Sequence, residues 1–308
     1  GQLREARLIQ VLRDAGVSLA EIGSLLRVPS SQQLDAWARQ VETEATERQK
    51  ALELARRMLT VETGSTASNE YPGGEVMTNV AAARTDIGRV RETNEDAVLA
   101  LERLVAVADG MGGAPGGEIA ASLAVALLES AFTGHSLEEL SAAVRAANRA
   151  IFERAGAGLE GMGTTLCAVG FIGSGRIAIV SVGDSRTYLL RDGSLRQLTQ
   201  DHSVTAELVR RGELTEDEAA GHPHRNVLTR VLGVGPTVEV DGSVESLVPG
   251  DRLLLCTDGL FNELPDADIR TLMEAGEDVG SVADALVDQA VSNGGHDNVG
   301  VVVVESHM

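Results

Sequence analysis

The sequence predicts an α+β protein in which antiparallel sheets pack together with helices outside them, preceded by a small all-α helical module. Three observations lead to this fold class. Short β-rich runs follow one another through hairpin turns at 173–175 and 192–193, which favours antiparallel pairing. Long helical blocks separate groups of these runs. Residues 1–60 carry nine Lys and Arg against eight Asp and Glu, whereas residues 61–308 carry 17 against 38, which indicates two modules.

The expected elements of the larger module follow in order along the chain. Residue types that favour strands occupy eight runs: Val76–Ala83, Asp96–Leu101, Leu104–Ala108, Thr164–Ile172, Arg176–Val182, Arg186–Leu190, Asp251–Cys256 and Asn298–Val304. Helical patterns cover Gly117–Phe132, Leu137–Ala155 and Ser281–Val291. A further helical pattern, Val204–Gly212, lies in the segment 201–236, which shows few strand signals.

The smaller module, residues 1–60, is predicted to be helical. After a first helix at Leu3–Arg13, Ser18 caps a second with Glu21 at the capping-box spacing. Within residues 31–59, the positions of one seam recur every 3.5 residues on average, which is typical of a coiled coil. All are apolar except Arg48: Leu34, Ala38, Val41, Ala45, Arg48, Leu52, Ala55 and Leu59. The seam predicts a homodimer through residues 31–59. The alternative is an amphipathic helix packed on the two preceding helices of its own chain.

Composition sets the expected domain boundaries. Residues 61–74 are rich in Gly, Ser and Thr and lack periodic apolar residues, so we expect a flexible linker there. The larger domain is expected over residues 75–305. The last three residues, 306–308, resemble a cloning remnant and are left outside it.

Composition and charge also exclude several classes of protein. A formal net charge of −20 and only seven aromatic residues offer neither a basic surface nor a base-stacking platform, so we expect no DNA binding from these residues alone. No apolar run approaches the roughly 20 residues of a membrane span, and a signal-peptide layout is lacking. We therefore expect no membrane association and a cytoplasmic location. Cys167 and Cys256 stand alone in apolar runs and are expected to be reduced core residues.

Four aspartates stand at the ends of apolar strands. Asp109 and Asp258 follow such runs and precede glycine, Asp184 ends another run, and Asp297 precedes the last. Where such strand ends converge, buried carboxylates stay ionised only beside cations. Oxygen ligands without nearby His or Cys favour Mg²⁺ or Mn²⁺ over Zn²⁺. The alternative, a simple strand-ending turn at each Asp-Gly pair, suits one pair better than four acidic strand ends.

Six motifs in this order carry a resemblance to a known family: TDIGRVRETNED at 85–96, VADGMGG at 107–113, GMGTT at 161–165, VGDSR at 182–186, CTDGL at 256–260 and GHDN at 295–298. Over about residues 76–305 the series resembles the bacterial branch of the metal-dependent protein phosphatases of the 2C type. The resemblance implies an α/β/β/α sandwich of two antiparallel sheets flanked by helices. It also implies hydrolysis of phosphoserine and phosphothreonine in proteins by a metal-activated water.

The resemblance implies a ligand set for two or three ions at the edge of the sheets. Asp109 is implied to bridge two Mg²⁺ or Mn²⁺ ions, and Gly110 to add its carbonyl. Asp258 and Asp297 would complete the protein ligands of the first ion. Asp184 would hold a third, weaker ion together with Asp258.

The resemblance also implies residues that act beside the ions. Glu95 and Asp96 would orient ion-bound waters, and Arg91 would receive the phosphate in a bidentate fork. Two positions depart from relatives. Met111 stands where many eukaryotic relatives carry the histidine assigned as acid for the leaving group, so the proton donor is unassigned. Gly300 stands where threonine is common, which we interpret as a packing difference.

The segment 201–236 matches in position the family's flap, a variable segment beside the metal centre that helps to choose substrates. It contains His222 and His224, which we expect to be an exposed pair rather than metal ligands.

A second, less specific resemblance concerns residues 8–26 and the long charged helix after them. They are similar to the second half of a MerR-type regulator, and the DNA-reading half of such a regulator is absent from these residues. Two alternative functions follow: a non-catalytic sensor with a phosphatase fold, or the effector domain of a MerR-like transcriptional regulator. Because every acidic motif position is filled, the leading hypothesis is a catalytic serine/threonine protein phosphatase.

Overall fold

The computed structural model describes residues 77–112, 116–155, 159 and 161–307. The helical module expected at 1–60, its seam at 31–59 and the linker expected at 61–74 lie outside the described residues. The MerR-like resemblance falls on the same part of the chain.

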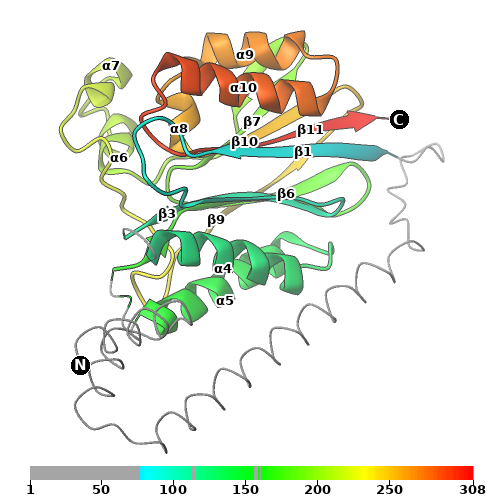
Figure 1. The fold of residues 1–308 in the computed structure, drawn as a ribbon. Coiled ribbons are helices and arrows are strands. Elements are labelled where there is room, and N and C mark those ends of the chain that lie inside the picture. The colour runs from blue at the N-terminus through cyan, green and yellow to red at the C-terminus, as the bar shows by residue number, and fades with distance from the viewer. Residues whose placement is uncertain (1–76, 113–115, 156–158, 160, 308) are drawn as a thin grey trace, which may run out of the picture. The chain divides into compact units, whose positions relative to one another are not determined.

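The described strands form two antiparallel sheets (Figure 1). The first has the order β1-β11-β10-β7-β8, with the bounds Thr78–Asp86, Val299–His307, Arg252–Cys256, Arg186–Arg191 and Ser194–Gln197. The second has the order β2-β3-β5-β6-β9, with the bounds Asp96–Ala100, Leu104–Met111, Leu166–Phe171, Arg176–Val182 and Asp241–Ser246. The short strand β4, Gly163–Thr164, pairs with β3.

Helices cover the outer face of each sheet, which makes four layers (Figure 1). α4 (Gly116–Ala131) and α5 (Leu137–Ala155) pack on the second sheet. α9 (Asp266–Ala275) and α10 (Val279–Asn293) pack on the first. The predicted α/β/β/α sandwich is therefore confirmed.

Three apolar cores follow from these layers, and the strand sequences explain them. In β5, Ala168 faces the core under α4 and α5, whereas Cys167 and Val169 face the core between the sheets. The central strand β11 is covered on both faces, so its valines form a continuous run rather than an alternating one. Val302 faces the inter-sheet core, and Val303 faces α9 and α10.

Several elements differ from the sequence prediction. The strand β9 and three helices were not expected; besides α9, these are α7 (Glu216–Ala220) and α8 (Asp258–Phe261). The strand β8 was implied only by the hairpin turn at 192–193, and no strand-forming run was assigned to it. β9 is an edge strand with a largely exposed, polar sequence, so no apolar alternation marks it. The expected strand at 164–172 is divided at Thr165 into β4 and β5.

The last strand is longer than expected. It runs to His307, and Ser306 is buried and pairs with Asn79 of β1. The Ser306 hydroxyl donates to the Asn79 side chain at 2.8 Å. Ser306 and His307, which were expected to lie outside the domain, are therefore part of the first sheet.

The segment between β8 and β9 lies at one end of the sheets (Figure 1). It contains α6, Val204–Arg210, whose N-cap Ser203 accepts from the backbone N–H of Ala206. Within the described part of the chain, no helix combines the length and apolar character needed to cross a membrane.

Candidate metal centre and active site

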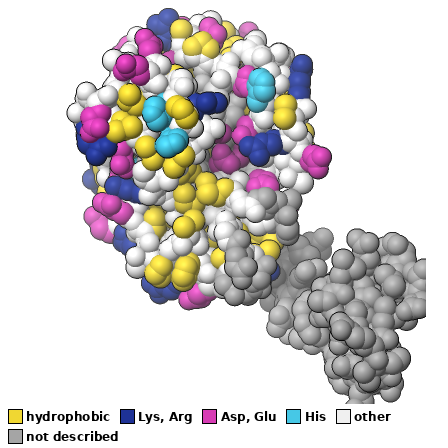
Figure 2. Space-filling model, turned by 90° about the vertical axis from the view of Figure 1, so that its left-hand side faces the viewer, with side chains coloured by type: hydrophobic (Ala, Val, Ile, Leu, Met, Phe, Trp, Pro, Cys, Tyr) yellow, Lys and Arg dark blue, Asp and Glu magenta, His cyan; other side chains and the backbone are white. Residues whose placement is uncertain are grey.

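A cleft of about 250 Å³ opens at the end of the two sheets where the predicted site residues meet. Figure 2 shows acidic side chains gathered near the middle of this face, beside a basic one. Seven of the eight predicted site residues line the cleft: Arg91, Glu95, Asp109, Gly110, Asp184, Asp258 and Asp297. The eighth, Asp96, does not line the cleft, and its Oδ1 atom is buried.

Asp109 lies inside a strand rather than after one, which corrects the expectation that the strand ends at Ala108. β3 continues to Met111 because its last residues pair with β4. Asp109 of β3 lies opposite Asp96 of the neighbouring strand β2. The Asp109 N–H donates to Thr165 Oγ1 at 3.0 Å, and its carbonyl accepts from the Thr165 N–H at 2.9 Å. Thr165 thus binds both the N–H and the carbonyl of this residue.

Gly110 has no room for a side chain. A Cβ at this position would lie 2.3 Å from the Gly117 carbonyl oxygen, and the Gly110 N–H donates to the Glu95 carbonyl at 3.2 Å. The glycine after Asp109 therefore allows three backbone segments to meet beside the carboxylates.

The other three carboxylates reach the cleft from separate elements. Asp258 is the first residue of α8, and its carboxylate accepts from Asn262 at 3.0 Å. Asp184 follows β6 in the connection to β7. Asp297 precedes β11 and forms an ion pair with Arg91 at 2.6 Å.

Asp96 is held from below by Thr257, a residue to which the sequence motifs gave no role. The Thr257 hydroxyl donates to Asp96 Oδ2 at 2.8 Å and accepts from the Gly300 N–H at 2.8 Å. A Cβ at Gly300 would lie 3.0 Å from Asp96 Oδ2, so glycine leaves room for this carboxylate. Among the buried side-chain atoms that the structure describes, Asp96 Oδ1 and Asp258 Oδ1 have no hydrogen-bond partner.

Burial and mutual repulsion disfavour ionised carboxylates in this cluster. Loss of hydration raises the pKa of Asp109 well above its ordinary value, and the charges of Asp96 and Asp258 raise it further. Loss of hydration is also the main cause of the raised pKa of Asp96, Asp184 and Asp258. Cations placed among these groups would reverse the effect by favouring the ionised forms.

Arg91 supplies one positive charge at the cleft. Its hydrogen bond with Asp297 is the main cause of its raised pKa, and the charges of Asp109 and Asp258 contribute as well. Over the described residues, no three carboxylate, imidazole or thiolate groups surround a common point as metal ligands would. The carboxylates therefore line one cleft without forming a closed ligand shell, and Asp297 is turned to the guanidinium.

Asn298 positions the loop that carries Arg91 and Glu95. Its Oδ1 accepts from the Glu95 N–H at 2.9 Å, and its Nδ2 donates to the carbonyls of Ile87 and Thr93, each at 2.9 Å. Asn298 belongs to the GHDN motif and stands directly before an apolar strand, but it was assigned no role from the sequence. Its position there was the feature that could have pointed to it.

The segment 201–236 lies beside the cleft, and two of its residues, Asn226 and Leu228, line it. The position of this segment beside the metal centre was expected from the sequence, but Asn226 and Leu228 were not expected to line the cleft. The segment is also tied to α5 by the buried Asn148, which accepts from the Gly233 N–H at 2.9 Å and donates to the Gly235 carbonyl at 3.0 Å. A polar residue on the apolar face of a helix was the available signal.

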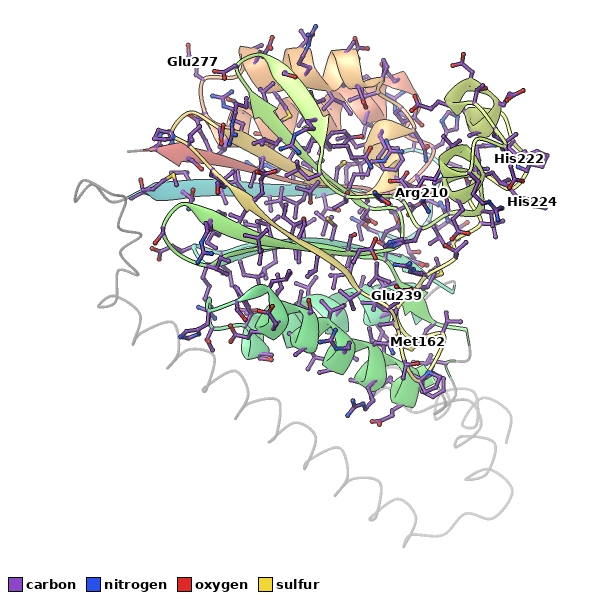
Figure 3. The ribbon with its side chains drawn as sticks, turned by 180° about the vertical axis from the view of Figure 1, so that it is seen from behind. Met162, Arg210, His222, His224, Glu239 and Glu277 are labelled. Atoms are coloured by element: carbon purple, nitrogen blue, oxygen red, sulfur yellow. The ribbon has the colours of Figure 1, made fainter. Side chains whose placement is uncertain are left out.

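His222 and His224 lie at the outer end of this segment and point away from the sheets (Figure 3). Their rings meet edge to face, with centroids 5.5 Å apart, and His222 Nδ1 accepts from the His224 N–H. One ring nitrogen of His222 is therefore used locally; His224 is exposed, as expected, whereas His222 is only partly exposed.

Comparisons with known proteins agree with this geometry. Residues 89–289 match the family model described as protein phosphatase 2C. The serine/threonine phosphatase Stp of Listeria innocua is 40% identical over 243 residues, which cover 74% of this chain and 96% of that protein. The serine/threonine protein phosphatase PstP of Mycobacterium tuberculosis is 45% identical over 230 residues, covering 73% of this chain and 44% of that protein.

Solved structures show the same likeness. A crystal structure of Mycobacterium tuberculosis PstP superposes with a TM-score of 0.71 at 43% identity, covering 75% of this chain and 100% of that chain. The catalytic domain of PstP in complex with two manganese ions superposes with a TM-score of 0.70 at 41% identity, covering 76% of this chain and 100% of that chain. With its two-sheet fold, its acidic cleft and these matches, the chain belongs to the protein phosphatase 2C family.

Proposed function

We propose that this protein phosphatase removes phosphate from phosphoserine and phosphothreonine residues of proteins with Mn²⁺ or Mg²⁺ ions held in the acidic cleft. One observation carries the proposal: partly buried carboxylates converge there, and the buried atoms Asp96 Oδ1 and Asp258 Oδ1 have no hydrogen-bond partner among the described residues. Buried carboxylate oxygens without partners are stable only as acids or beside cations.

The donor set fits hard divalent ions. The acidic groups of the cleft are all carboxylates, and the histidines and cysteines of the described residues do not line it. We assign Asp109, Asp258, Asp297 and the Gly110 carbonyl to a pair of ions, and Asp184 with Asp258 to a third, weaker one. The PstP catalytic domain bound to two manganese ions supports the use of Mn²⁺.

The protein's own residues bind and orient the substrate. A phosphate dianion approaches a chain of net charge −20, so a local positive field is needed at the cleft. When bound, divalent ions supply such charge and lower the pKa of a coordinated water. Arg91 is placed to donate two N–H groups to phosphate oxygens once Asp297 binds a cation instead. Glu95 and Asp96 are placed to accept hydrogen bonds from water in and below the cleft.

The leaving alkoxide needs a proton. Met111 lines the cleft and has none to donate, and no described residue that lines the cleft is a histidine. We therefore assign the proton to water.

The test is metal-dependent hydrolysis of a phosphothreonine peptide by the full chain. Asp109→Asn is expected to lower kcat by about 10³-fold, since metal charge stabilisation is worth several kcal/mol and each decade is about 1.36 kcal/mol. Asp288→Asn, an exposed change on α10, is the matched control and should leave kcat unchanged. Activity that survives a chelator, or a fully active Asp109→Asn variant, would contradict the proposal.

We also propose that the protein is a cytoplasmic homodimer. The apolar seam in the sequence of residues 31–59 supports the dimer. The two cysteines, Cys167 and Cys256, are free thiols rather than disulfide-bonded, which supports a reducing compartment.

A further inference from the structure

The connection that carries Asp184 depends on an unusual backbone conformation at Gly183. This residue has φ +100°, and a Cβ would lie 2.6 Å from Thr165 Cγ2. Both features exclude a side chain. The direction in which Asp184 leaves β6 therefore depends on what holds the peptide groups of Gly183.

His202, from the segment beside the cleft, holds both of these peptide groups. Its backbone N–H donates to the Gly183 carbonyl at 2.9 Å, and its ring Nδ1 contacts the Gly183 nitrogen at 3.0 Å. The side chain is buried, with 2% of the residue exposed. One residue thus binds the N–H and the carbonyl immediately before Asp184.

The partner of Nδ1 identifies the tautomer of the ring. A backbone N–H can only donate, so Nδ1 accepts and carries no proton. The proton of the neutral ring is then on Nε2, which faces Asp241 Oδ2 at 3.0 Å. The other Asp241 oxygen accepts from Arg230 at 2.6 Å.

Charged groups on the far side of the ring complete this arrangement. The Nη1 atom of Arg230 lies 3.2 Å from His202 Nε2, and the Nη2 atom of the same arginine forms an ion pair with Glu239. Figure 3 labels Glu239 on the chain just before β9. Asp241 is the first residue of β9. The ring therefore links the Asp184 connection to the segment 201–236 and to β9.

The residue after Asp184 is fixed by a separate contact. Ser185 Oγ lies 2.7 Å from Thr165 Oγ1, which also accepts from the Asp109 N–H. Asp184 therefore stands between two neighbours with buried partners, and one of those partners also binds the Asp109 backbone. His202 and Thr165 together determine how this carboxylate approaches the one proposed to bridge two ions.

We propose that His202 is a positioning residue: in its Nε2–H tautomer it holds the Gly183 peptide groups and thereby directs the Asp184 carboxylate toward the weakest metal site. This inference rests on the proposed function, because it takes Asp184 as a ligand. His202 acts through Gly183 and does not line the cleft.

Two isosteric substitutions separate this role from simple packing. In His202→Asn the side-chain oxygen takes the place of Nδ1 and keeps the acceptor for Gly183, while the contact with Asp241 is lost. In His202→Gln the terminal amide reaches the position of Nε2 and keeps the donor for Asp241, while the acceptor is lost. His224→Asn, an exposed change in the same segment, is the control.

The first measurement is binding of Mn²⁺ alone to the full chain, by calorimetry and by electron paramagnetic resonance. His202→Gln is expected to weaken the weakest Mn²⁺ site by roughly 10- to 100-fold, the usual effect of losing a group that orients a ligand. His202→Asn and His224→Asn should bind Mn²⁺ as the wild type does. Equal behaviour of the Asn and Gln variants, with or without loss of Mn²⁺, would overturn the proposal.

The second measurement needs no variant and no metal. Long-range ¹H–¹⁵N spectra of the wild-type chain report which ring nitrogen carries the proton, and the proton is expected on Nε2 of His202. A proton on Nδ1 would overturn the proposal even where a variant fails to fold. Neither measurement requires substrate or catalytic activity. If the wild-type protein proved inactive, the proposed function would be contradicted, but the role of His202 would still be decided by Mn²⁺ binding and by the tautomer of its ring.

Discussion

At the residue scale, Arg91 has two partners available to it. In the structure its guanidinium is bound to Asp297, a group proposed as a metal ligand. A cation at Asp297 would compete for that carboxylate and leave the guanidinium for a phosphate. Under the proposed function, the same side chain would pair with Asp297 before the cation binds and with the substrate phosphate afterwards.

Arg91→Ala is expected to raise the KM for a phosphopeptide without lowering Mn²⁺ affinity, since the change removes a competitor for the Asp297 carboxylate. The loss in transition-state binding should be about 1.5–3 kcal/mol, the range for a hydrogen bond to a charged group. Steady-state kinetics and calorimetry with Mn²⁺ make the measurement. Arg89→Ala, an exposed change two residues earlier, is the control. A fall in Mn²⁺ affinity in Arg91→Ala would show that the arginine has a structural role in the metal centre.

At the element scale, the connection between α4 and α5 is organised by one carboxylate. Glu139, in the first turn of α5, accepts from the backbone N–H groups of Thr133 and His135, both at 2.9 Å. Burial alone raises the pKa of Glu139, but the hydrogen bonds from Thr133 and His135 outweigh it and hold this pKa below 4.5. Because folding favours the ionised form, the stabilisation is present above that pH and is lost as the pH falls through the folded-state pKa.

Glu139→Gln should therefore lower the free energy of unfolding by about 1 kcal/mol at neutral pH, the usual value for a helix N-terminal contact. The difference from wild type should shrink as the pH falls below 4.5, where the carboxyl becomes protonated in both folded and unfolded chains. Urea unfolding at two pH values measures it. Glu153→Gln, exposed on the same helix, should show no such trend. A difference that is equal at both pH values would contradict the assignment.

The elements also show what local sequence patterns can predict. The apolar runs of β5, β6 and β10 and the helices α4, α5 and α10 appeared where periodicity predicted them, within two residues at most boundaries. β9 and α7 did not, because their residues are largely exposed and carry no apolar period. β3 extends past Ala108 because backbone pairing with β2 and β4 continues through Asp109 and Gly110.

At the scale of the whole molecule, the proposed dimer can be separated from the phosphatase. Deleting residues 1–74 is expected to leave an active, monomeric domain, because the sequence of residues 61–74 indicates a linker and the seam lies before it. The full chain should be a dimer, since a helix with the seam predicted in residues 31–59 would expose a continuous apolar stripe unless a second copy covered it. Light scattering at micromolar concentration measures both. A monomeric full chain, or a dimeric truncated one, would contradict the proposal.

Local sequence patterns and motifs were enough to predict the fold class and the carboxylates that belong to the cleft. Periodicity, caps and turns reflect free energies that act within a few residues, and the ordered motifs identify the acidic strand ends. Asp109, Asp184, Asp258 and Asp297 could therefore be selected from the motifs alone, and all four line one cleft.

The contacts between these residues could not be predicted in the same way, because they depend on how distant elements pack. Asp96 lies opposite Asp109 through strand register, Arg91 meets Asp297 across 206 positions of the chain, and His202 holds the turn before Asp184. Each contact joins elements whose relative placement depends on the packing of both sheets and on the segment between β8 and β9. No local sequence pattern encodes these long-range contacts, because the free energy that stabilises them arises only when the whole core is assembled.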